Sequence, residues 1–231
     1  MTITSGPASP AAPSGAMPAV RSLRGWARVF VTKPTPKLIA GYGAIALGAR
    51  AVLGRWSWLD LVPVVAILAF EPFTEWVIHV VILHWKPRRI LGREVDLPTA
   101  QEHRAHHADP RNLDLLFVPM RVIVFWVPLL DALALVVLPT RVALSAVAAA
   151  MAMLLAYEWT HMLIHSPYQP RHRYYRSIWR SHRLHHYRNE HYWFGVTVTV
   201  GDRVLRTFPA KADVELSATV RTLGIDPSTE L

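Results

Sequence analysis

The sequence predicts an all-α, polytopic membrane protein with about four transmembrane helices and a histidine-rich helical cap on the cytosolic side. Three observations lead to this prediction. Hydrophobic residues make up 52% of the chain and the mean hydropathy is +0.22, which is too apolar for an ordinary soluble domain. Four apolar segments alternate with polar connections. The basic residues, finally, are divided unequally between those connections.

The distribution of positive charge predicts the orientation of these segments. The N-terminal arm has five Lys or Arg residues, the long central loop with the start of the third segment seven and the C-terminal region ten, whereas the two short opposite turns with the end of the first segment have three between them. Because basic residues concentrate on the cytoplasmic side of membrane proteins, both termini are expected there. A basic face toward anionic lipid headgroups is compatible with the same count. The net charge of +9 therefore does not indicate nucleic-acid binding.

The N-terminal arm is expected to be only partly structured. Residues 1–20 are rich in Pro, Ala, Ser and Gly and are predicted to be a disordered tail, without the apolar core and cleavage site of a secretory signal. Residues 21–30 place Trp26 and Phe30 among three arginines, a pattern typical of a short amphipathic helix lying on the membrane surface.

Four apolar segments follow, near residues 38–53, 58–85, 115–138 and 142–163. The first is short and carries Arg50, whose charge is expected to reach the membrane interface. The second would extend about 42 Å as a helix, so its far end must protrude from a hydrocarbon core of about 30 Å. The third and fourth are separated by only three residues and are predicted to form an antiparallel hairpin. After Gly195, the alternation in VTVTV indicates a short extended segment.

Histidine stands out against this apolar background. Ten of the twelve histidines fall into four clusters with the spacings HxxxxH, HxxHH, HxxxH and HxxHH. Residues three and four apart lie on one face of a helix, so such a cluster presents its imidazoles toward a common point. Because the chain has no cysteine, any metal here is held by nitrogen and oxygen. The clusters therefore predict a polynuclear metal site, with His79, His84, His103, His106, His107, His161, His165, His182, His185 and His186 as its histidines.

The first cluster sets a condition on its helix. A spacing of five residues places the His79 and His84 rings about 140° apart on an ideal helix, so the helix must bend, widen or end between them. Glu75 lies one turn before His79 and could accept a hydrogen bond from an imidazole or be a carboxylate at the membrane boundary. Glu158, three residues before His161, could likewise support an imidazole.

Ten imidazoles can fill the inner shells of two metal ions and leave positions open for oxygen or substrate. Such open, nitrogen-rich coordination suits iron that activates O2, although zinc can occupy the same nitrogens. The predicted cofactors are therefore two iron ions, with O2 as co-substrate. Because two clusters lie at the ends of apolar segments, the site can reach the chain of a lipid whose head stays in the interface.

The clusters and their flanks resemble the membrane-bound fatty acid hydroxylase and sterol desaturase superfamily, and their order is most similar to that of fatty acid 2-hydroxylases. HRAHHADPRNLDLLFVP is similar to the family's histidine box followed by proline and an apolar stretch, and HRLHHYRNEHYWFGVTVTVGD is similar to its last box. The similarity extends from about Glu71 to Phe208. It implies a membrane-embedded hydroxylase domain over residues 21–210 and a C-terminal tail over 211–231. It also implies that the ten clustered histidines are the ligands of a dimetal centre, to which His191 could be added, whereas His172 is expected at the surface or facing substrate.

The family inserts an oxygen atom into a lipid C–H bond, or desaturates the lipid. The resemblance thus implies hydroxylation of a lipid, in the first place a fatty acyl chain, with O2 and external electrons. The chain has no room for the cytochrome b5 domain that some fatty acid 2-hydroxylases carry. A separate electron donor, a ferredoxin or a cytochrome b5-like protein, is therefore expected to dock on the arginine-rich face. Reversal of Arg88, Arg89 and Arg180 to Glu tests this expectation through the rate of reduction.

Other functions explain the clusters less well. No HExxH motif is present, which argues against a zinc metalloprotease. A metal transporter would place its ligands near the bilayer midplane instead of at helix ends. Within the superfamily, a carotenoid or sterol-type hydroxylase or desaturase is the main alternative, because box spacing does not define the substrate pocket. The excess of Arg over Lys and the absence of a retention signal at Glu230-Leu231 favour an integral protein of a bacterial inner membrane, with its active site in the cytoplasm.

Overall fold

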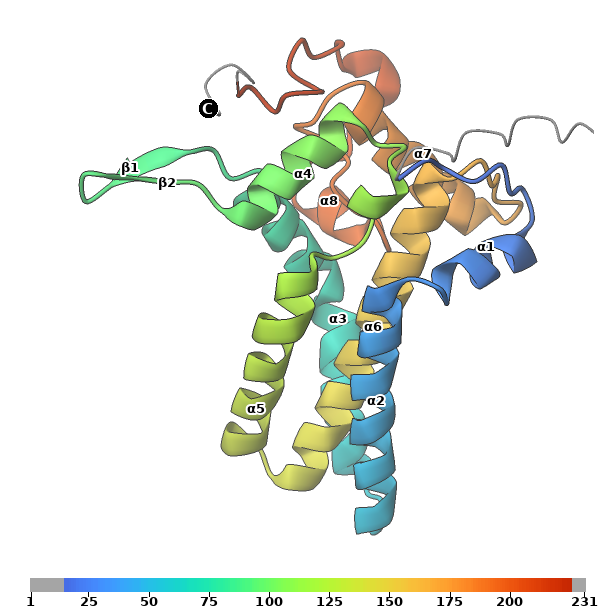
Figure 1. Cartoon of the computed structure of the whole chain (residues 1–231), viewed down its shortest axis with the longest axis vertical. Helices are drawn as coiled ribbons and strands as arrows, with labels where there is room; N and C mark the ends of the chain where they lie inside the picture. The colour runs from blue at the N-terminus through green and yellow to red at the C-terminus, as the bar shows by residue number, and fades with distance from the viewer. Residues whose placement is uncertain (1–14, 226–231) are drawn as a thin grey trace, which may run out of the picture.

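The chain folds into a shaft of long helices below a head of shorter ones (Figure 1). The computed structural model describes residues 15–225. The shaft consists of α2 (Pro34–Leu53), α3 (Leu61–Val77), α5 (Val127–Val137) and α6 (Thr140–His165). The head consists of α1 (Leu23–Phe30), α4 (Pro98–Ala108), α7 (Arg173–Tyr187), α8 (Val200–Val204) and one antiparallel hairpin of β1 (Arg88–Ile90) and β2 (Arg93–Val95). The prediction of a mostly helical protein is therefore confirmed, with the hairpin as an unpredicted exception.

Two shaft helices are long and apolar enough to cross a membrane. The first runs from Trp58 to Leu83 through the 3-10 turn η1 (Trp58–Asp60), α3 and the π-helical segment η2 (Ile78–Leu83), and the second is α6. Each has 26 residues, or about 39 Å at 1.5 Å per residue, which exceeds a hydrocarbon core of about 30 Å. Only 6% of the apolar window of the first and 28% of that of the second are buried inside the protein. Most of their apolar side chains are therefore free to contact lipid.

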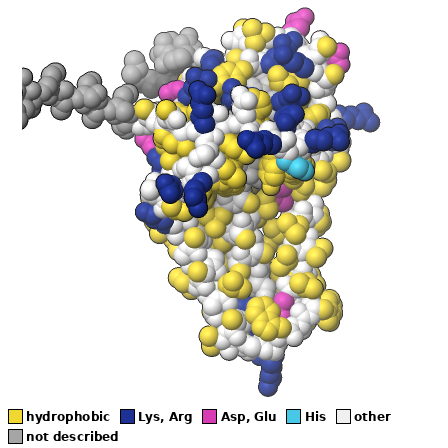
Figure 2. All heavy atoms as spheres, turned by 90° about the vertical axis from the view of Figure 1, so that its right-hand side faces the viewer, with side chains coloured by type: hydrophobic (Ala, Val, Ile, Leu, Met, Phe, Trp, Pro, Cys, Tyr) yellow, Lys and Arg dark blue, Asp and Glu magenta, His cyan; other side chains and the backbone are white. Residues whose placement is uncertain are grey.

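The surface agrees with this division. Figure 2 shows hydrophobic side chains over the tapering shaft, whereas Lys and Arg side chains gather mainly over the head. Leu68 and Phe70 on α3 and Leu129 and Leu133 on α5 are all more than half exposed. A soluble protein would bury such residues in its core, so the exposed apolar shaft indicates association with a membrane.

The two other apolar segments form shorter helices. α2 has 20 residues, and its Ile39 and Ala46 belong to the same buried cluster as Met151 of α6. The third helical run begins with the π-helical segment η4 (Val122–Trp126) and continues through α5, so it starts later than the expected residue 115. The reason is that Leu116 packs in the head beside α1 and not in the shaft. The predicted hairpin of α5 and α6 is present, since α6 begins three residues after α5 ends.

Arg50, whose charge was expected to reach the membrane interface, is fully buried inside the protein. Its Nε and Nη2 donate to the two carboxylate oxygens of Asp60 at 2.5 and 2.6 Å, and its Nη1 donates to the Gly54 carbonyl at 2.8 Å. Ser145 Oγ donates to the same carboxylate at 2.8 Å. A buried charge needs a partner of this kind. Asp60 supplies it, and the pair ties α2, η1 and α6 together at the end of the shaft away from the head.

Part of the N-terminal arm packs on the head. The first fourteen residues lie outside the described part of the chain, but Met17 and Val20 contact the cluster around Trp26, so the expected disordered tail does not extend to residue 20. α1 forms as predicted and begins after Ser22, whose side chain accepts from the Gly25 N–H. Its Trp26 is fully buried and donates to the Val20 carbonyl at 2.9 Å. The apolar face of α1 therefore covers the protein and not only a membrane surface.

The C-terminal region closes the head from the other side. The extended segment expected after Gly195 does not form, and these residues make a loop that leads into α8. The tail expected over 211–231 also folds back as far as it is described, with Val214, Val220 and Leu223 buried. These contacts place the C-terminal region against the histidine-bearing helices.

Candidate metal centre

The head brings ten histidines together where α3 and α6 end. They form two groups, and within each group one nitrogen from every imidazole lies within 4.8 Å of the others. Group 1 comprises His79, His84, His103, His107 and His185, and group 2 comprises His106, His161, His165, His182 and His186. Nine of the ten are buried and His84 is half-buried. The structure thus brings together all the histidines of the four sequence clusters.

The two groups exchange one histidine each. The helix ending in η2 and α4 supply four members of group 1, and α6 and α7 supply four members of group 2. The middle histidine of each HxxHH cluster crosses over, so His185 of α7 joins group 1 and His106 of α4 joins group 2. The ring centroids of His185 and His79 are 4.6 Å apart, as are those of His106 and His165. Separation of α4 from α7 would therefore open both groups.

The π-helical segment η2 accommodates the spacing of the first cluster. In a π-helix a backbone N–H bonds to the carbonyl five residues earlier, and the His84 N–H donates to the His79 carbonyl at 3.0 Å. This widening brings the two ring centroids to 5.0 Å. The prediction that the helix must bend, widen or end between these residues is confirmed, and the helix widens.

Backbone carbonyls fix the orientation of four rings. The Nδ1 atoms of His79, His107, His161 and His185 lie 2.7, 2.9, 2.8 and 2.8 Å from the carbonyl oxygens of Phe194, Val220, Leu116 and Tyr192, respectively. A carbonyl oxygen can only accept, so each of these Nδ1 atoms carries the hydrogen and each Nε2 keeps its lone pair. This arrangement is typical of metal-binding histidines, whose second ring nitrogen is held by a carbonyl or a carboxylate.

Two of these lone pairs face each other. The Nε2 atoms of His185 and His107 are 3.1 Å apart, and neither carries a hydrogen because both rings donate through Nδ1. Burial lowers the pKa of His107 to about 3 and the pKa of His185 well below its ordinary value, so both rings are neutral at pH 7. A metal ion that accepts both lone pairs would stabilise this pair. Two nitrogens bound to one metal at about 2.1 Å lie roughly 3.0–3.4 Å apart, which matches the observed separation.

Further ring nitrogens point into the groups without a partner. Within residues 15–225, no hydrogen bond reaches the buried Nε2 atoms of His79, His84 and His103 in group 1. In group 2, both ring nitrogens of His106 and His165 are equally without one. A buried polar atom without a partner costs about 1–3 kcal/mol, and a metal ion in each group would take one lone pair from each of these neutral rings. Both groups therefore fit a metal ion.

Glu75 binds the loop whose Phe194 carbonyl holds the His79 ring. Its carboxylate accepts hydrogen bonds from the backbone N–H groups of Val196 and Thr197, the second at 3.0 Å, and from Thr197 Oγ1 at 2.5 Å. These residues follow Phe194, whose carbonyl holds His79. We expected Glu75 to face either an imidazole or the membrane boundary. The structure instead places it between the helix that bears His79 and the 194–197 loop, where it fixes the ring through the loop.

Glu158 binds the loop whose Leu116 carbonyl holds the His161 ring, as Glu75 does for His79. It is fully buried and accepts from the Val118 backbone N–H at 3.0 Å. Val118 lies two residues after Leu116, whose carbonyl holds His161. The 116–118 loop follows α4, and the 194–197 loop follows α7. Each HxxHH helix therefore sends its following loop across to the histidine helix of the other half.

Asp202 holds the first two residues of the 194–197 loop, whereas Glu75 holds the last two. Its carboxylate accepts from the backbone N–H groups of Phe194 and Gly195 at 2.9 and 2.7 Å. A Cβ atom at Gly195 would lie 2.1 Å from a backbone carbonyl oxygen, so a larger residue does not fit there. The Phe-Gly-Val-Thr and Asp residues of the last sequence motif thus form one unit that positions a carbonyl on His79.

Two histidines lie outside both groups in the described part of the chain. The His191 side chain is 64% exposed and its Nε2 is 3.5 Å from Glu190, so the structure does not bring it to either group. His172 is exposed and caps α7, with its Nδ1 accepting from the Tyr174 N–H at 3.3 Å. It also lines a largely apolar cavity of about 330 Å³ beside Trp159.

The residues that orient the rings were missed by the sequence analysis because they act through backbone carbonyls and not side chains. Val220 is the clearest case, since it lies in the tail to which no motif was assigned. A signal was present there, because Val214, Val220 and Leu223 are apolar residues in a mostly polar stretch. Such residues predict burial, although they do not predict which carbonyl meets a histidine.

Together, the fold and the site define a helical, membrane-associated protein with a histidine-rich site that fits two metal ions. The family model described as fatty acid hydroxylase matches residues 64–207, and this protein belongs to the fatty acid hydroxylase family. Among solved structures, full-length Scs7p, of which only the hydroxylase domain is visible, is similar in fold. Its TM-score is 0.65 and its sequence identity 21%, over 79% of this chain and 68% of that chain. No curated protein matches this sequence.

Proposed function

We propose that this protein is a membrane-bound dimetal oxygenase that hydroxylates a C–H bond of a lipid, most simply of a fatty acyl chain. The observation that carries the proposal is the pair of interlocked histidine groups, whose lone pairs converge where two helices of membrane-spanning length end. Membership of the fatty acid hydroxylase family supports the reaction class. In the balanced reaction, C–H and O2 with two electrons and two protons give C–OH and water.

The ten histidines of groups 1 and 2 would hold two ions, which we infer to be iron. Iron supplies the activation of O2 when it is bound, whereas zinc can occupy the same nitrogens without redox chemistry. The chain keeps the ligands ready for metal, because burial lowers the pKa values of His103, His106, His182 and His186 well below the ordinary value. Neutral imidazoles bind metal without first losing a proton. The burial of the groups also excludes water from the reacting atoms.

We further propose four membrane spans with the head in the cytoplasm of a bacterium. α2 is about 30 Å long, and the run from Val122 to Val137 is about 24 Å long, so both can complete a bundle with the two longer helices. The positive charges of the head favour the cytoplasmic side. With this orientation the histidine groups would lie at the membrane surface, where an acyl chain can reach them while its polar head stays in the interface.

Metal analysis and lipid mass spectrometry test the proposal together. The detergent-purified protein is expected to contain two iron ions per chain, and membranes of cells that express it are expected to contain lipids heavier by one oxygen atom. Cells that express a His106→Ala/His185→Ala variant provide the matched control, since both crossed ligands are removed. One metal ion or none, together with unchanged lipids, would reject the oxygenase.

A further inference from the structure

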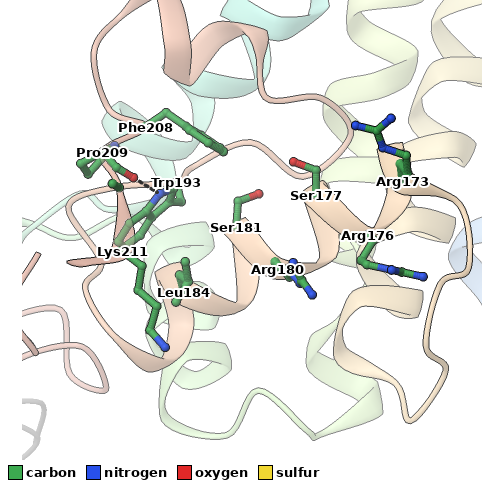
Figure 3. A pocket seen from close by; sticks show the side chains of 11 residues that line it. Arg173, Arg176, Ser177, Arg180, Ser181, Leu184, Trp193, Phe208, Pro209 and Lys211 are labelled. Carbon is green, nitrogen blue, oxygen red and sulfur yellow. Dashed lines mark hydrogen bonds between the residues drawn. The ribbon is translucent and has the colours of Figure 1, made fainter. Parts of the chain in front are cut away.

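A basic groove lies on the side of α7 that faces away from the histidine groups. It has a volume of about 440 Å³. One wall is formed by α7 side chains and the other by Trp193 and the segment from Phe208 to Lys211 (Figure 3). Trp193 is 1% exposed and donates to the Pro209 carbonyl at 3.2 Å, so it is fixed to the segment with which it forms this wall.

The groove carries positive charge that the protein does not neutralise. Arg173, Arg176 and Arg180 recur at helical spacing along α7 and are exposed, and Lys211 lies on the opposite wall. None of these four residues forms an ion pair with any residue between 15 and 225. α7 itself contains no acidic residue. A row of unpaired cations of this kind attracts an acidic surface.

A short path of covalent and hydrogen bonds joins the groove to group 1. The carbonyls on either side of Trp193, those of Tyr192 and Phe194, accept from the rings of His185 and His79. Trp193 has a φ of +59°, a conformation that is rare for a bulky residue and marks a constrained turn. This turn directs both neighbouring carbonyls to group 1. A partner that contacts Trp193 is thus connected to two group 1 rings through the neighbouring carbonyls and their hydrogen bonds.

We propose that this groove is the docking site of an acidic one-electron carrier protein, and that electrons enter the site at group 1 through the segment around Trp193. The inference rests on the proposed oxygenase function and names its electron partner surface. Each transfer oxidises the carrier by one electron and reduces the metal centre by one. Two transfers, with two protons, balance the conversion of one C–H bond and O2 to one C–OH group and one water.

The arrangement of the cations favours a protein over a single phosphate group. Arg173 and Arg180 are seven residues apart and therefore about 10 Å apart along the helix. Figure 3 shows the arginines spread along α7 and not converging on one point. A phosphate is bound where donors converge, whereas a row of carboxylates on a protein matches a row of cations. Transient complexes of electron carriers are also small and depend on charge complementarity.

The test compares two charge reversals of equal size in the full-length, detergent-purified protein. Arg176→Glu/Arg180→Glu changes the groove, and Arg88→Glu/Arg93→Glu changes the β1–β2 hairpin by the same four charge units. The probe is a purified acidic plant-type [2Fe–2S] ferredoxin, whose Kd is measured by calorimetry at low and high salt. We expect the groove variant to bind at least about tenfold more weakly at low salt and the hairpin variant less than about threefold more weakly. Equal weakening by both variants, or unchanged binding by the groove variant, would overturn the proposal.

Two further measurements separate failure of the groove from failure of the oxygenase. In the first, pre-reduced ferredoxin is mixed with the iron-loaded protein and its oxidation is followed by absorbance. If the groove is wrong, the groove variant oxidises ferredoxin at the rate of the unchanged protein. If the oxygenase is wrong, no variant oxidises it, even where binding is intact. In the second, vesicles with anionic lipid replace ferredoxin, and a groove variant that loses binding only to vesicles would assign the groove to lipid headgroups and overturn the proposal.

Discussion

The two histidine groups are built from the same parts but are held differently. Each combines a histidine pair at the end of a long helix, two histidines of the neighbouring HxxHH helix and one that crosses from the other half. In group 1, three rings are fixed by carbonyls, those of Tyr192, Phe194 and Val220. In group 2, one ring is fixed in this way, by Leu116. The carbonyls of group 1 all come from the region after α7.

The two groups therefore depend on different parts of the chain. Group 2 is placed mainly by α6 and α7 themselves, which keep their histidines in register along one helix face each. Group 1 needs the C-terminal region, because its helix is widened at η2 and its rings are held by distant loops. Changes after residue 190 should therefore act first on group 1. Four experiments can test this dependence. Three substitute the ligands, the supporting carboxylates or the outlying histidines, and the fourth measures unfolding at low pH.

Removal of a crossed histidine should have the largest effect. In His185→Ala, group 1 loses one of its five imidazoles, and in His106→Ala group 2 loses one. We expect either change to reduce lipid hydroxylation at least about 100-fold and to lower the metal content from two ions per chain toward one. Membrane insertion should be unchanged, because neither residue lies in a long apolar helix. Mass spectrometry of lipids and metal analysis of the purified variants measure both effects.

The same two variants also test whether the groups are separate. If each histidine serves the group in which it lies, the two variants lose different ions and the double variant loses both. Retained turnover in His185→Ala would remove this residue from the ligand set. Complete loss of both ions in either single variant would show that the groups form one cooperative unit.

The sequence was sufficient to find the histidines, and the reason is chemical. Imidazoles that share a metal must lie on common helix faces, and this leaves spacings such as HxxHH in the chain. The HxxxxH spacing even indicated a local irregularity, which the structure shows as the π-helical segment η2. The crossing of His106 and His185 could not be predicted, because adjacent residues of one helix point in different directions and only the tertiary arrangement decides what each one meets.

The parts of the fold that could not be predicted depend on partners distant in the sequence. The sequence pattern around Arg50 did not reveal its partner Asp60, which also accepts from Ser145. Trp26 looked like a membrane anchor, yet it packs on residues more than 80 positions later. VTVTV has the alternation of a strand, but no neighbouring strand is available in the described part of the chain and Glu75 takes its first N–H groups instead. In each case a tertiary contact overrides a correct local pattern.

Replacement of Glu75 should weaken metal binding more than replacement of Glu158. Glu75 accepts from two N–H groups and one hydroxyl of the 194–197 loop, whereas Glu158 accepts from one N–H of the 116–118 loop. In Glu75→Gln, only one of the two oxygens remains as an acceptor and an NH2 group replaces the other, so we expect about 10–100-fold weaker metal binding in group 1. Glu158→Gln should weaken group 2 less than about tenfold. Metal titration against a competing chelator measures both.

An equal or larger effect of Glu158→Gln would contradict the difference between the halves. The Glu→Gln exchange keeps size and shape, so a loss of folding is not expected to dominate. Thermal unfolding of both variants controls for it, with a cost of about 1–3 kcal/mol for a buried donor that loses its acceptor. If metal binding stays unchanged while stability falls, the carboxylates stabilise the loops without positioning the rings.

Acid should destabilise the metal-free protein. Burial lowers the pKa of His107 to about 3, whereas an unfolded histidine has a pKa near 6.5. Between these values the unfolded chain binds a proton that the folded chain does not, so stability falls as the pH decreases below about 6.5. Each such histidine contributes a slope of up to about 1.4 kcal/mol per pH unit. We expect a lower unfolding temperature at pH 5.5 than at pH 7 after chelation, and an unchanged temperature would show that the rings are not held neutral.

Replacement of the two outlying histidines should have the smallest effect. His191 is exposed, and His172 makes one long capping bond at 3.3 Å, so His191→Ala and His172→Ala should keep two metal ions and activity within about twofold. Loss of the α7 cap should cost His172→Ala about 0.5–1 kcal/mol of stability. A large loss of metal in His191→Ala would make it an eleventh ligand. A large loss of activity in His172→Ala with both metals present would place the substrate in the apolar cavity that His172 lines, because neither the metal groups nor the α7 fold would then explain the defect.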